Sequence, residues 1–276
     1  MTYRFSTPAL PLIVLTDLDG TLLDHHSYSF AAAEPALNRL RRAGVPLVIV
    51  TSKTRAEVAR LADRLESPHP YVLENGALIA LPPGYFGEDG GALIRLSPAY
   101  EELCAWAARI RREKGYRFRG FADMDAAAVA AATGLSEEDA ALAKARDGSE
   151  PFIWEDTPEA LQAFSADVEA RGWRLMQGGR FYHLLGRTDK AYAAEQLLSH
   201  YRELPGEPLR SIALGDSPND LPLLQIADIA VVIRRHDGSW MDAQVNGRKI
   251  QTEGIGPVGW NEAVGSILTE LESTHV

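Results

Sequence analysis

The segment at residues 12–24 constrains the fold of this chain more than any other part of the sequence. An apolar run at residues 12–15 is followed by Thr-Asp-Leu-Asp-Gly-Thr, so the carboxylates of Asp17 and Asp19 come directly after the run. A short apolar run between a proline and a glycine predicts a strand that is buried on both faces, as in the inner part of an α/β sheet. Ligands bind at the carboxyl ends of such strands.

Asp17 and Asp19 have two interpretations. Two close carboxylates repel each other, and buried ones must be paired, protonated or bound to a metal ion, which favours a cation at this position. Alternatively, the two acids only cap the turn that follows, as aspartates commonly do.

Strands, polar turns and helices alternate in the first part of the chain and again after residue 186. This alternation predicts an α/β fold with a doubly wound, parallel, Rossmann-like sheet. The predicted strands cover residues 45–50, 209–214 and 229–233, and the predicted helices cover residues 31–43, 55–65, 188–203 (with Thr188 as cap), 221–226 and 260–272. Two apolar arms around Asn75-Gly76, at residues 71–81, predict a β-hairpin.

The pattern becomes less regular between residues 84 and 186. Pro82-Pro83-Gly84 and the glycine-rich residues 87–91 break the alternation, which marks a domain boundary. The segment beyond this boundary mixes helices with strands, including a predicted hairpin at residues 173–185, which indicates an α+β module. We therefore predict a core domain at residues 1–83 and 187–276 with an inserted α+β cap domain at residues 84–186.

Composition excludes several classes of partner. The formal charge is 28 − 38 = −10 without a basic cluster, which argues against a nucleic-acid or anionic-membrane surface. No apolar stretch approaches the roughly 20 residues of a bilayer span, and no signal-peptide pattern precedes the first strand. The single Cys104 excludes an internal disulfide. We expect a soluble, cytoplasmic protein that is a monomer or a homodimer.

Polar residues follow or flank several of the predicted core strands. Because the carboxyl ends of parallel strands line one edge of a sheet, residues far apart in sequence converge there. Carboxylate oxygens suit Mg²⁺, and a hydroxyl and an ammonium group suit phosphate oxygens. The candidates are Asp17, Asp19, Thr51, Lys190, Asp216 and Asp220. Thr51 has the alternative role of a helix cap, and Lys190 that of a solvated surface residue.

These positions, in this order, resemble the four motifs of the haloacid dehalogenase-like hydrolases. The resemblance implies that Asp17 is a nucleophile that forms an aspartyl-phosphate, and that Asp19 is the general acid and base. It further implies that Thr51 and Lys190 hold the phosphoryl group. The Mg²⁺ ligands implied are Asp17, the carbonyl oxygen of Asp19, and Asp216, with Asp220 in support.

The spacing of the motifs resembles one subgroup of that family. The 190 − 51 = 139 residues between Thr51 and Lys190 put the inserted module after the second motif, as in the α/β-capped (Cof-like) subgroup, which acts mainly on sugar phosphates. The strings at residues 51–57, 146–152, 177–183 and 256–260 are similar to those of phosphatases of mannosyl-3-phosphoglycerate. This similarity implies substrate contacts by Ser52, Lys53, Lys144, Arg146, Ser149, Gln177, Gly178, Gly179 and Arg180. Alternatively, Gly178-Gly179 is only a hairpin turn and the basic residues are surface charges.

The expected function is that of a Mg²⁺-dependent phosphatase for a small-molecule phosphate ester. Mannosyl-3-phosphoglycerate, with its glucosyl analogue, is the expected substrate. Three alternatives stay open: a phosphatase of another sugar phosphate such as sucrose phosphate, a sugar phosphomutase of the same fold, and a non-catalytic protein that binds sugar phosphates.

Overall fold

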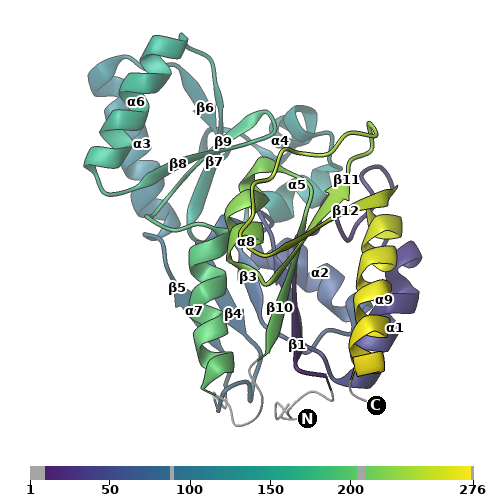
Figure 1. Cartoon of the computed structure of the whole chain (residues 1–276). Helices are drawn as coiled ribbons and strands as arrows, with labels where there is room; N and C mark the ends of the chain where they lie inside the picture. The colour runs from purple at the N-terminus through teal and green to yellow at the C-terminus, as the bar shows by residue number, and fades with distance from the viewer. Residues whose placement is uncertain (1–9, 88–89, 204–208, 275–276) are drawn as a thin grey trace.

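The computed structural model describes residues 10–87, 90–203 and 209–274. Its larger sheet has eight strands in the order β12-β11-β10-β1-β2-β3-β4-β5 (Figure 1). Neighbouring strands are parallel from β12 to β3, and β4 and β5 are antiparallel to their neighbours. The strands are β1 (Leu12–Thr16), β2 (Leu47–Val50), β3 (Tyr71–Leu73), β4 (Leu78–Leu81), β5 (Ala92–Arg95), β10 (Arg210–Gly215), β11 (Ile229–Arg234) and β12 (Arg248–Ile255). The predicted doubly wound α/β fold is confirmed.

Helices cover both faces of this sheet. The alternate residues Leu12 and Val14 of β1 pack with α1, α2 and α9, whereas Ile13 and Leu15 pack with α7 and α8. Every residue of β1 is therefore buried, as expected for a strand between two helix layers. The helices are α1 (Glu34–Ala43), α2 (Arg55–Leu65), α7 (Lys190–Arg202), α8 (Leu221–Ile226) and α9 (Pro257–Thr274).

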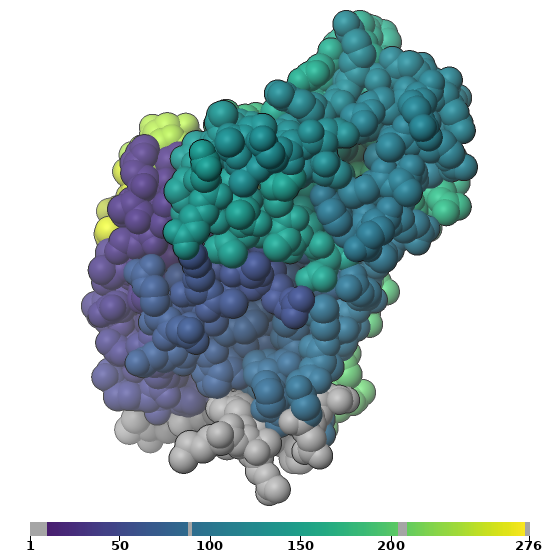
Figure 2. Space-filling model, turned by 180° about the vertical axis from the view of Figure 1, so that it is seen from behind, coloured from purple at the N-terminus to yellow at the C-terminus, as the bar shows by residue number. Residues whose placement is uncertain are grey.

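A second, antiparallel sheet has the order β6-β7-β9-β8 and lies beyond the carboxyl ends of the core strands (Figure 1). Its strands are β6 (Phe118–Gly120), β7 (Ser149–Trp154), β8 (Arg174–Gly178) and β9 (Phe181–Leu185). Helices α3 (Tyr100–Lys114) and α6 (Pro158–Ala170) pack on one face, and α4 (Ala126–Thr133) and α5 (Glu137–Lys144) form a separate apolar cluster that includes Ile153 and Phe181. Figure 2 shows the residues around α5 pressed against those of α2, where Arg60 pairs with Glu138 and Asp139.

The register of the core strands aligns their carboxyl ends. Thr16 of β1 lies opposite Leu214 of β10 and Ile49 of β2. The polar segments that follow these three strands therefore begin side by side. The end of β1 is fixed from α9, because the indole N–H of Trp260, which is fully buried, donates to Thr16 Oγ1 at 3.0 Å. Thr16 in turn donates to the carbonyl oxygen of Asp17 at 2.8 Å.

Local expectations differ from the structure at three places. Thr188 does not cap α7: Asp189 does so by accepting from the N–H of Tyr192, while Thr188 donates its hydroxyl to the carbonyl of Gly76. Strand β12 was not expected, because its exposed edge carries polar residues. The domain limits stay a prediction, although β5 pairs with β4 and extends the large sheet to Arg95, beyond the expected limit at residue 83. The hairpin around Asn75-Gly76 is confirmed.

A buried histidine in the core predicts a pH-dependent stability. His69 is 8 % exposed, and its Nδ1 lies 2.8 Å from the hydroxyl of Tyr85. Burial lowers the pKa of His69 to about 4. Because this pKa is below that of an unfolded histidine, the unfolded chain binds the extra proton first, so stability is complete above about pH 6.5 and falls as the pH drops toward 4. Lowering the pH from 7.5 to 5 therefore reduces the free energy of unfolding by about 2 kcal/mol through this group.

Urea unfolding at these two pH values measures the effect. A His69→Gln variant should show a smaller difference between the two pH values than the parent protein, whereas a His200→Gln variant at an exposed position should not. An unchanged difference in His69→Gln would show that the protonation of His69 is not linked to folding.

Candidate active site

The candidate site lies at the carboxyl edge of the large sheet, where the segments after β1, β2 and β10 meet the first turn of α7 (Figure 1). Lys190 is fully buried at the start of α7 and lies between two carboxylates. Its ammonium nitrogen is 2.6 Å from Asp17 Oδ1 and 2.6 Å from Asp220 Oδ1. Burial alone would lower the pKa of Lys190, but the two carboxylates outweigh it and raise the pKa above its ordinary value. Lys190 is therefore a buried, charged residue that bonds two carboxylates, and not a solvated surface residue.

Asp220 is held by the turn that follows β10. Its Oδ2 accepts from the main-chain N–H groups of Asp216 at 3.2 Å and Ser217 at 3.0 Å, and from the Ser217 hydroxyl at 3.0 Å. Position 215 has no room for a side chain, because a Cβ there would lie 2.4 Å from the Cβ of Asp220. The turn thus fixes one Asp220 oxygen and directs the other toward Lys190.

Asp216 lies beside the segment that follows β1. The Thr21 hydroxyl is 3.4 Å from Asp216 Oδ1, and a Cβ on Gly20 would lie 2.8 Å from Oδ2. Gly20 has a φ of +75°, a conformation that favours glycine, so two requirements select glycine after Asp19. Burial, and then the charge of Asp220, raises the pKa of Asp216 to about 7. The surroundings of the Asp216 carboxylate therefore hold too little positive charge to balance its negative charge.

Three carboxylates form a group that fits a metal ion. One oxygen each from Asp17, Asp216 and Asp220 lies within 4.8 Å of the others. Burial, followed by the charge of Asp220, also raises the pKa of Asp17 well above its ordinary value, although Lys190 opposes the shift. Because hard oxygen donors crowd together with too little positive charge, this donor set suits a hard divalent cation. The carboxylate of Asp19 is not part of this group, and the predicted role of its carbonyl oxygen stays a prediction.

Asp19 turns its carboxylate toward Lys53 on the other side of the site. Lys53 Nζ lies 2.9 Å from Asp19 Oδ2 and 3.8 Å from Glu57. Burial would lower the pKa of Lys53, but Asp19 and then Glu57 raise it above its ordinary value. The other oxygen, Asp19 Oδ1, is buried and has no hydrogen-bond partner among the described residues. One oxygen of Asp19 is thus held by a cation while the other stays available.

Thr51 follows β2 at the same edge and is fully buried. Its Oγ1 accepts from the N–H of Lys53 at 3.2 Å. The alternative role of helix cap belongs to Thr54, whose side chain forms a capping box with Glu57 at the start of α2. The structure therefore brings Thr51 to the predicted edge without a capping role.

Three of the residues predicted to bind substrate from residues 84–186, namely Lys144, Arg146 and Ser149, have protein partners. Arg146 is buried and donates to the carbonyls of Ser149, Ala143 and Ser52, and it lies 3.4 Å from Glu74. Lys144 donates to the carbonyls of two residues between β6 and α4, namely Phe121 and Met124. Ser149 bonds to Glu74 and Arg146, while Gln177, Gly179 and Arg180 are exposed and Gly178 is partly buried in the β8–β9 hairpin. The predicted substrate contacts of this set stay predictions.

Glu74 was not anticipated as part of the site region. This fully buried carboxylate follows β3 and accepts from the N–H groups of Asp147 and Gly148 and from the Ser149 hydroxyl. It therefore joins the core to the beginning of β7. The sequence does contain a signal for Glu74, because it comes directly after a core strand, as Asp17 and Thr51 do.

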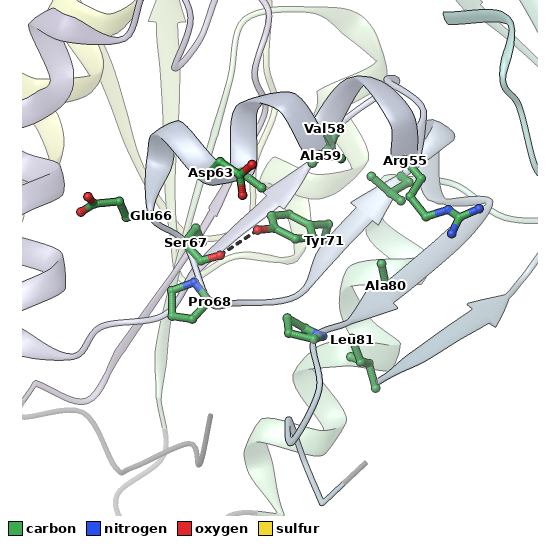
Figure 3. Close-up of a pocket in the computed structure, with 13 residues that line it drawn as sticks. Arg55, Val58, Ala59, Asp63, Glu66, Ser67, Pro68, Tyr71, Ala80 and Leu81 are labelled. Carbon is green, nitrogen blue, oxygen red and sulfur yellow. Dashed lines mark hydrogen bonds between the residues drawn. The ribbon is translucent and has the colours of Figure 1, made fainter. Parts of the chain in front are cut away.

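Two surface hollows differ in their relation to these residues. The hollow in Figure 3, with a volume of about 530 Å³, is bounded by α2 and the β3–β4 hairpin, where the Tyr71 hydroxyl donates to the Ser67 carbonyl. None of the predicted site residues lines it. A hollow of about 580 Å³ between α2, residues 23–28 and α5 is lined by Lys53. The second hollow, and not the first, therefore borders the site.

The fold and this constellation define the class of protein. Residues 14–85 match the family model of haloacid dehalogenase-like hydrolases. The chain belongs to the haloacid dehalogenase-like hydrolases, as its similarity to full-length relatives shows.

Two curated relatives carry the same name, glucosyl-3-phosphoglycerate/mannosyl-3-phosphoglycerate phosphatase. The protein from Methanococcoides burtonii is 39 % identical over 93 % of this chain and 97 % of its own length. The protein from Persephonella marina is 38 % identical over 95 % of this chain and 98 % of its own length.

Solved structures with low identity share the fold. A haloacid dehalogenase-like hydrolase from Bacteroides thetaiotaomicron has a TM-score of 0.62 at 17 % identity, covering 93 % of this chain and 99 % of its own. The sucrose-phosphatase from Synechocystis has a TM-score of 0.57 at 17 % identity, covering 93 % and 98 %. Among the described residues, every helix is too short or too polar to cross a membrane.

Proposed function

We propose that this chain is a Mg²⁺-dependent phosphatase that hydrolyses mannosyl-3-phosphoglycerate, and its glucosyl analogue, to the glycosylglycerate and phosphate. The observation that carries the proposal is the position of Lys190, whose ammonium nitrogen lies 2.6 Å from one carboxylate oxygen of Asp17 and 2.6 Å from one of Asp220. Asp19 lies on the opposite side of the site. The substrate is supported by the names of the two relatives that match nearly the whole chain.

The chemistry begins with Asp17. Its free carboxylate oxygen attacks phosphorus, the bond between phosphorus and the ester oxygen breaks, and an aspartyl-phosphate forms. Lys190 and Thr51 bind the oxygens of the phosphoryl group during the transfer. Lys190 also fixes Oδ1 of Asp17, which leaves Oδ2 for the attack.

Asp19 transfers the protons. Its Oδ1 carries a proton to the leaving alkoxide in the first step. In the second step the same carboxylate removes a proton from water, which attacks phosphorus and releases Asp17 and inorganic phosphate. Asp19 Oδ1 has no hydrogen-bond partner in the part of the chain that the structure describes, which supports this role, because the atom can bond first the leaving oxygen and then the water.

Asp17, Asp216 and Asp220 would hold the Mg²⁺ ion, with the Asp19 carbonyl oxygen as a further ligand. When bound, the ion supplies positive charge beside the transferring phosphoryl group. Residues 84–186 would act as a cap that excludes water from the reacting centre.

Phosphate release from a panel of esters tests the proposal. The panel contains mannosyl- and glucosyl-3-phosphoglycerate, sucrose phosphate, hexose phosphates and p-nitrophenyl phosphate. We expect the two glycosyl phosphoglycerates to have the highest kcat/KM. A higher value for sucrose phosphate would overturn the substrate assignment, and an isomerised sugar phosphate with little free phosphate would indicate a phosphomutase.

Metal removal has a predicted effect on stability as well as on rate. Treatment with EDTA should abolish phosphate release, and Mg²⁺ at about 100 times its Kd should stabilise the fold by about 2.7 kcal/mol. Thermal melting measures this gain, with KCl of equal ionic strength as the control. The gain should disappear in Asp216→Asn. A melting temperature that does not respond to Mg²⁺ would contradict a metal site at these carboxylates.

A further inference from the structure

Three buried side-chain atoms have no hydrogen-bond partner among the described residues. They are Asp19 Oδ1, Glu150 Oε2 and His183 Nδ1. An unsatisfied buried polar atom is costly and needs a physical explanation, such as a ligand that is absent. The proposed mechanism accounts for Asp19, because the leaving oxygen bonds it. His183 and Glu150 play no part in that mechanism.

Glu150 and His183 lie on opposite faces of the small sheet. Side chains alternate along β7, and His183 of β9 is paired with Pro151, the residue after Glu150. Phe152, on the same face as Glu150, packs among α3 and α6. Glu150 therefore lies on the face covered by α3 and α6, and His183 lies on the other face, where Ile153 and Phe181 pack with α4 and α5.

The face that carries His183 turns toward the catalytic edge. His183 lies on the inner strand β9 beside Met176 of β8, and β8 lies against the 3-10 turn Pro218–Asp220, which carries Asp220 (Figure 1). Burial, and then the positive charges of Arg146 and Lys190, lower the pKa of His183 to about 3. Its imidazole is thus neutral at physiological pH and offers one donor and one acceptor.

The β8–β9 hairpin leaves room for this ring. A Cβ on Gly178 would lie 3.3 Å from His183 Nε2, tighter than most contacts of that kind. A larger residue at position 178 would therefore require the ring to shift by a few tenths of an ångström. Gly178 therefore has a packing reason that is independent of the turn, whereas a Cβ on Gly179 would meet no atom within 4 Å.

We propose that His183 is a specificity-determining residue whose Nδ1 atom hydrogen-bonds an oxygen of the leaving group, on the side remote from the transferred phosphate. Asp19 Oδ1 and His183 Nδ1 then contact the same leaving group, one at the ester oxygen and one further along it. This inference rests on the proposed function, since it concerns the leaving group of the same ester.

Substitution of His183 tests the inference with two esters. The test compares the best glycosyl ester, whose large leaving group should reach residues 84–186, with p-nitrophenyl phosphate as a small reference. His183→Phe keeps a ring without a polar atom, and we expect it to lose about 10- to 100-fold in kcat/KM for the glycosyl ester. The value for p-nitrophenyl phosphate should change less than about twofold. His183→Asn, whose amide lies near the position of Nδ1, should recover most of the lost activity.

Two further measurements separate this contact from a structural role. Tyr182→Phe changes the neighbouring residue on the opposite face and should leave both esters unaffected. The binding of glycosylglycerate, the product without phosphate, should weaken in His183→Phe as kcat/KM does. Equal losses on both esters, or no loss on the glycosyl ester, would overturn the inference. If the parent enzyme prefers another ester, the proposed function fails instead, and the same comparison is made with the preferred ester.

Discussion

An Asp17→Asn variant is expected to lose kcat by a factor on the order of 10⁴ or more while it stays folded, as expected when an enzyme loses its nucleophile. The amide cannot form the acyl phosphate, whereas the remaining machinery is unchanged because Lys190 keeps its 2.6 Å contact with Asp220. Burial and the neighbouring carboxylates raise the pKa of Asp17, which means that its charge is unfavourable in the folded state. The neutral amide should therefore keep the melting temperature or raise it.

We therefore expect the activity of this variant to fall while its stability does not. Phosphate release and thermal melting measure the two quantities, and substrate binding to the inactive variant shows that the site is intact. Asp242→Asn, at an exposed loop position, is the matched control and should leave both quantities unchanged. Residual activity within about tenfold of the parent enzyme would exclude Asp17 as the nucleophile.

Glu74→Ala is expected to destabilise the fold by about 3–5 kcal/mol, the cost of breaking a buried ion pair from one side. Glu74 is fully buried, lies 3.4 Å from Arg146 and accepts bonds from two main-chain N–H groups and one hydroxyl of residues 147–149. Its removal leaves the Arg146 guanidinium buried beside unpaired N–H groups. Chemical unfolding of the variant measures the loss.

A double-mutant cycle tests whether the pair itself is responsible. Once Glu74 is gone, Arg146→Met removes the uncompensated charge, so the double variant should lose clearly less than the sum of the two single variants. Strictly additive losses would mean that Glu74 acts only through the N–H groups of Asp147 and Gly148. A loss below about 1 kcal/mol in Glu74→Ala would contradict the buried network.

The core of the site was predictable because it depends on local patterns. Parallel strands are marked by apolar runs, and their carboxyl ends share one edge, so the sequence alone predicts that Asp17, Thr51 and Asp216 lie together. Lys190 followed from its order among the motifs, since nothing in its immediate sequence distinguishes it from a surface lysine. The glycine after Asp19, Gly20, also has a local explanation, because its backbone has a positive φ, which favours glycine.

The contacts of residues 84–186 were harder to predict because they are long-range. Lys144 and Arg146 look like anion-binding residues in the sequence, yet their partners are main-chain carbonyls and Glu74, which is 72 positions from Arg146 (146 − 74). Strand β12 has an exposed edge with polar residues and therefore lacks the apolar run that marked the inner strands. The unsatisfied nitrogen of His183 depends on what surrounds it, which no spacing in the sequence reveals.

The covalent state of Asp17 during turnover is the most direct test of the central claim. Enzyme quenched during hydrolysis of a glycosyl phosphoglycerate and reduced with tritiated borohydride should carry the label at position 17, because borohydride reduces an acyl phosphate and leaves a free carboxylate unchanged. Peptide mapping should find tritium in the peptide of Asp17 and none in Asp17→Asn. Label on a different acidic residue, or continued turnover without any label, would contradict the account.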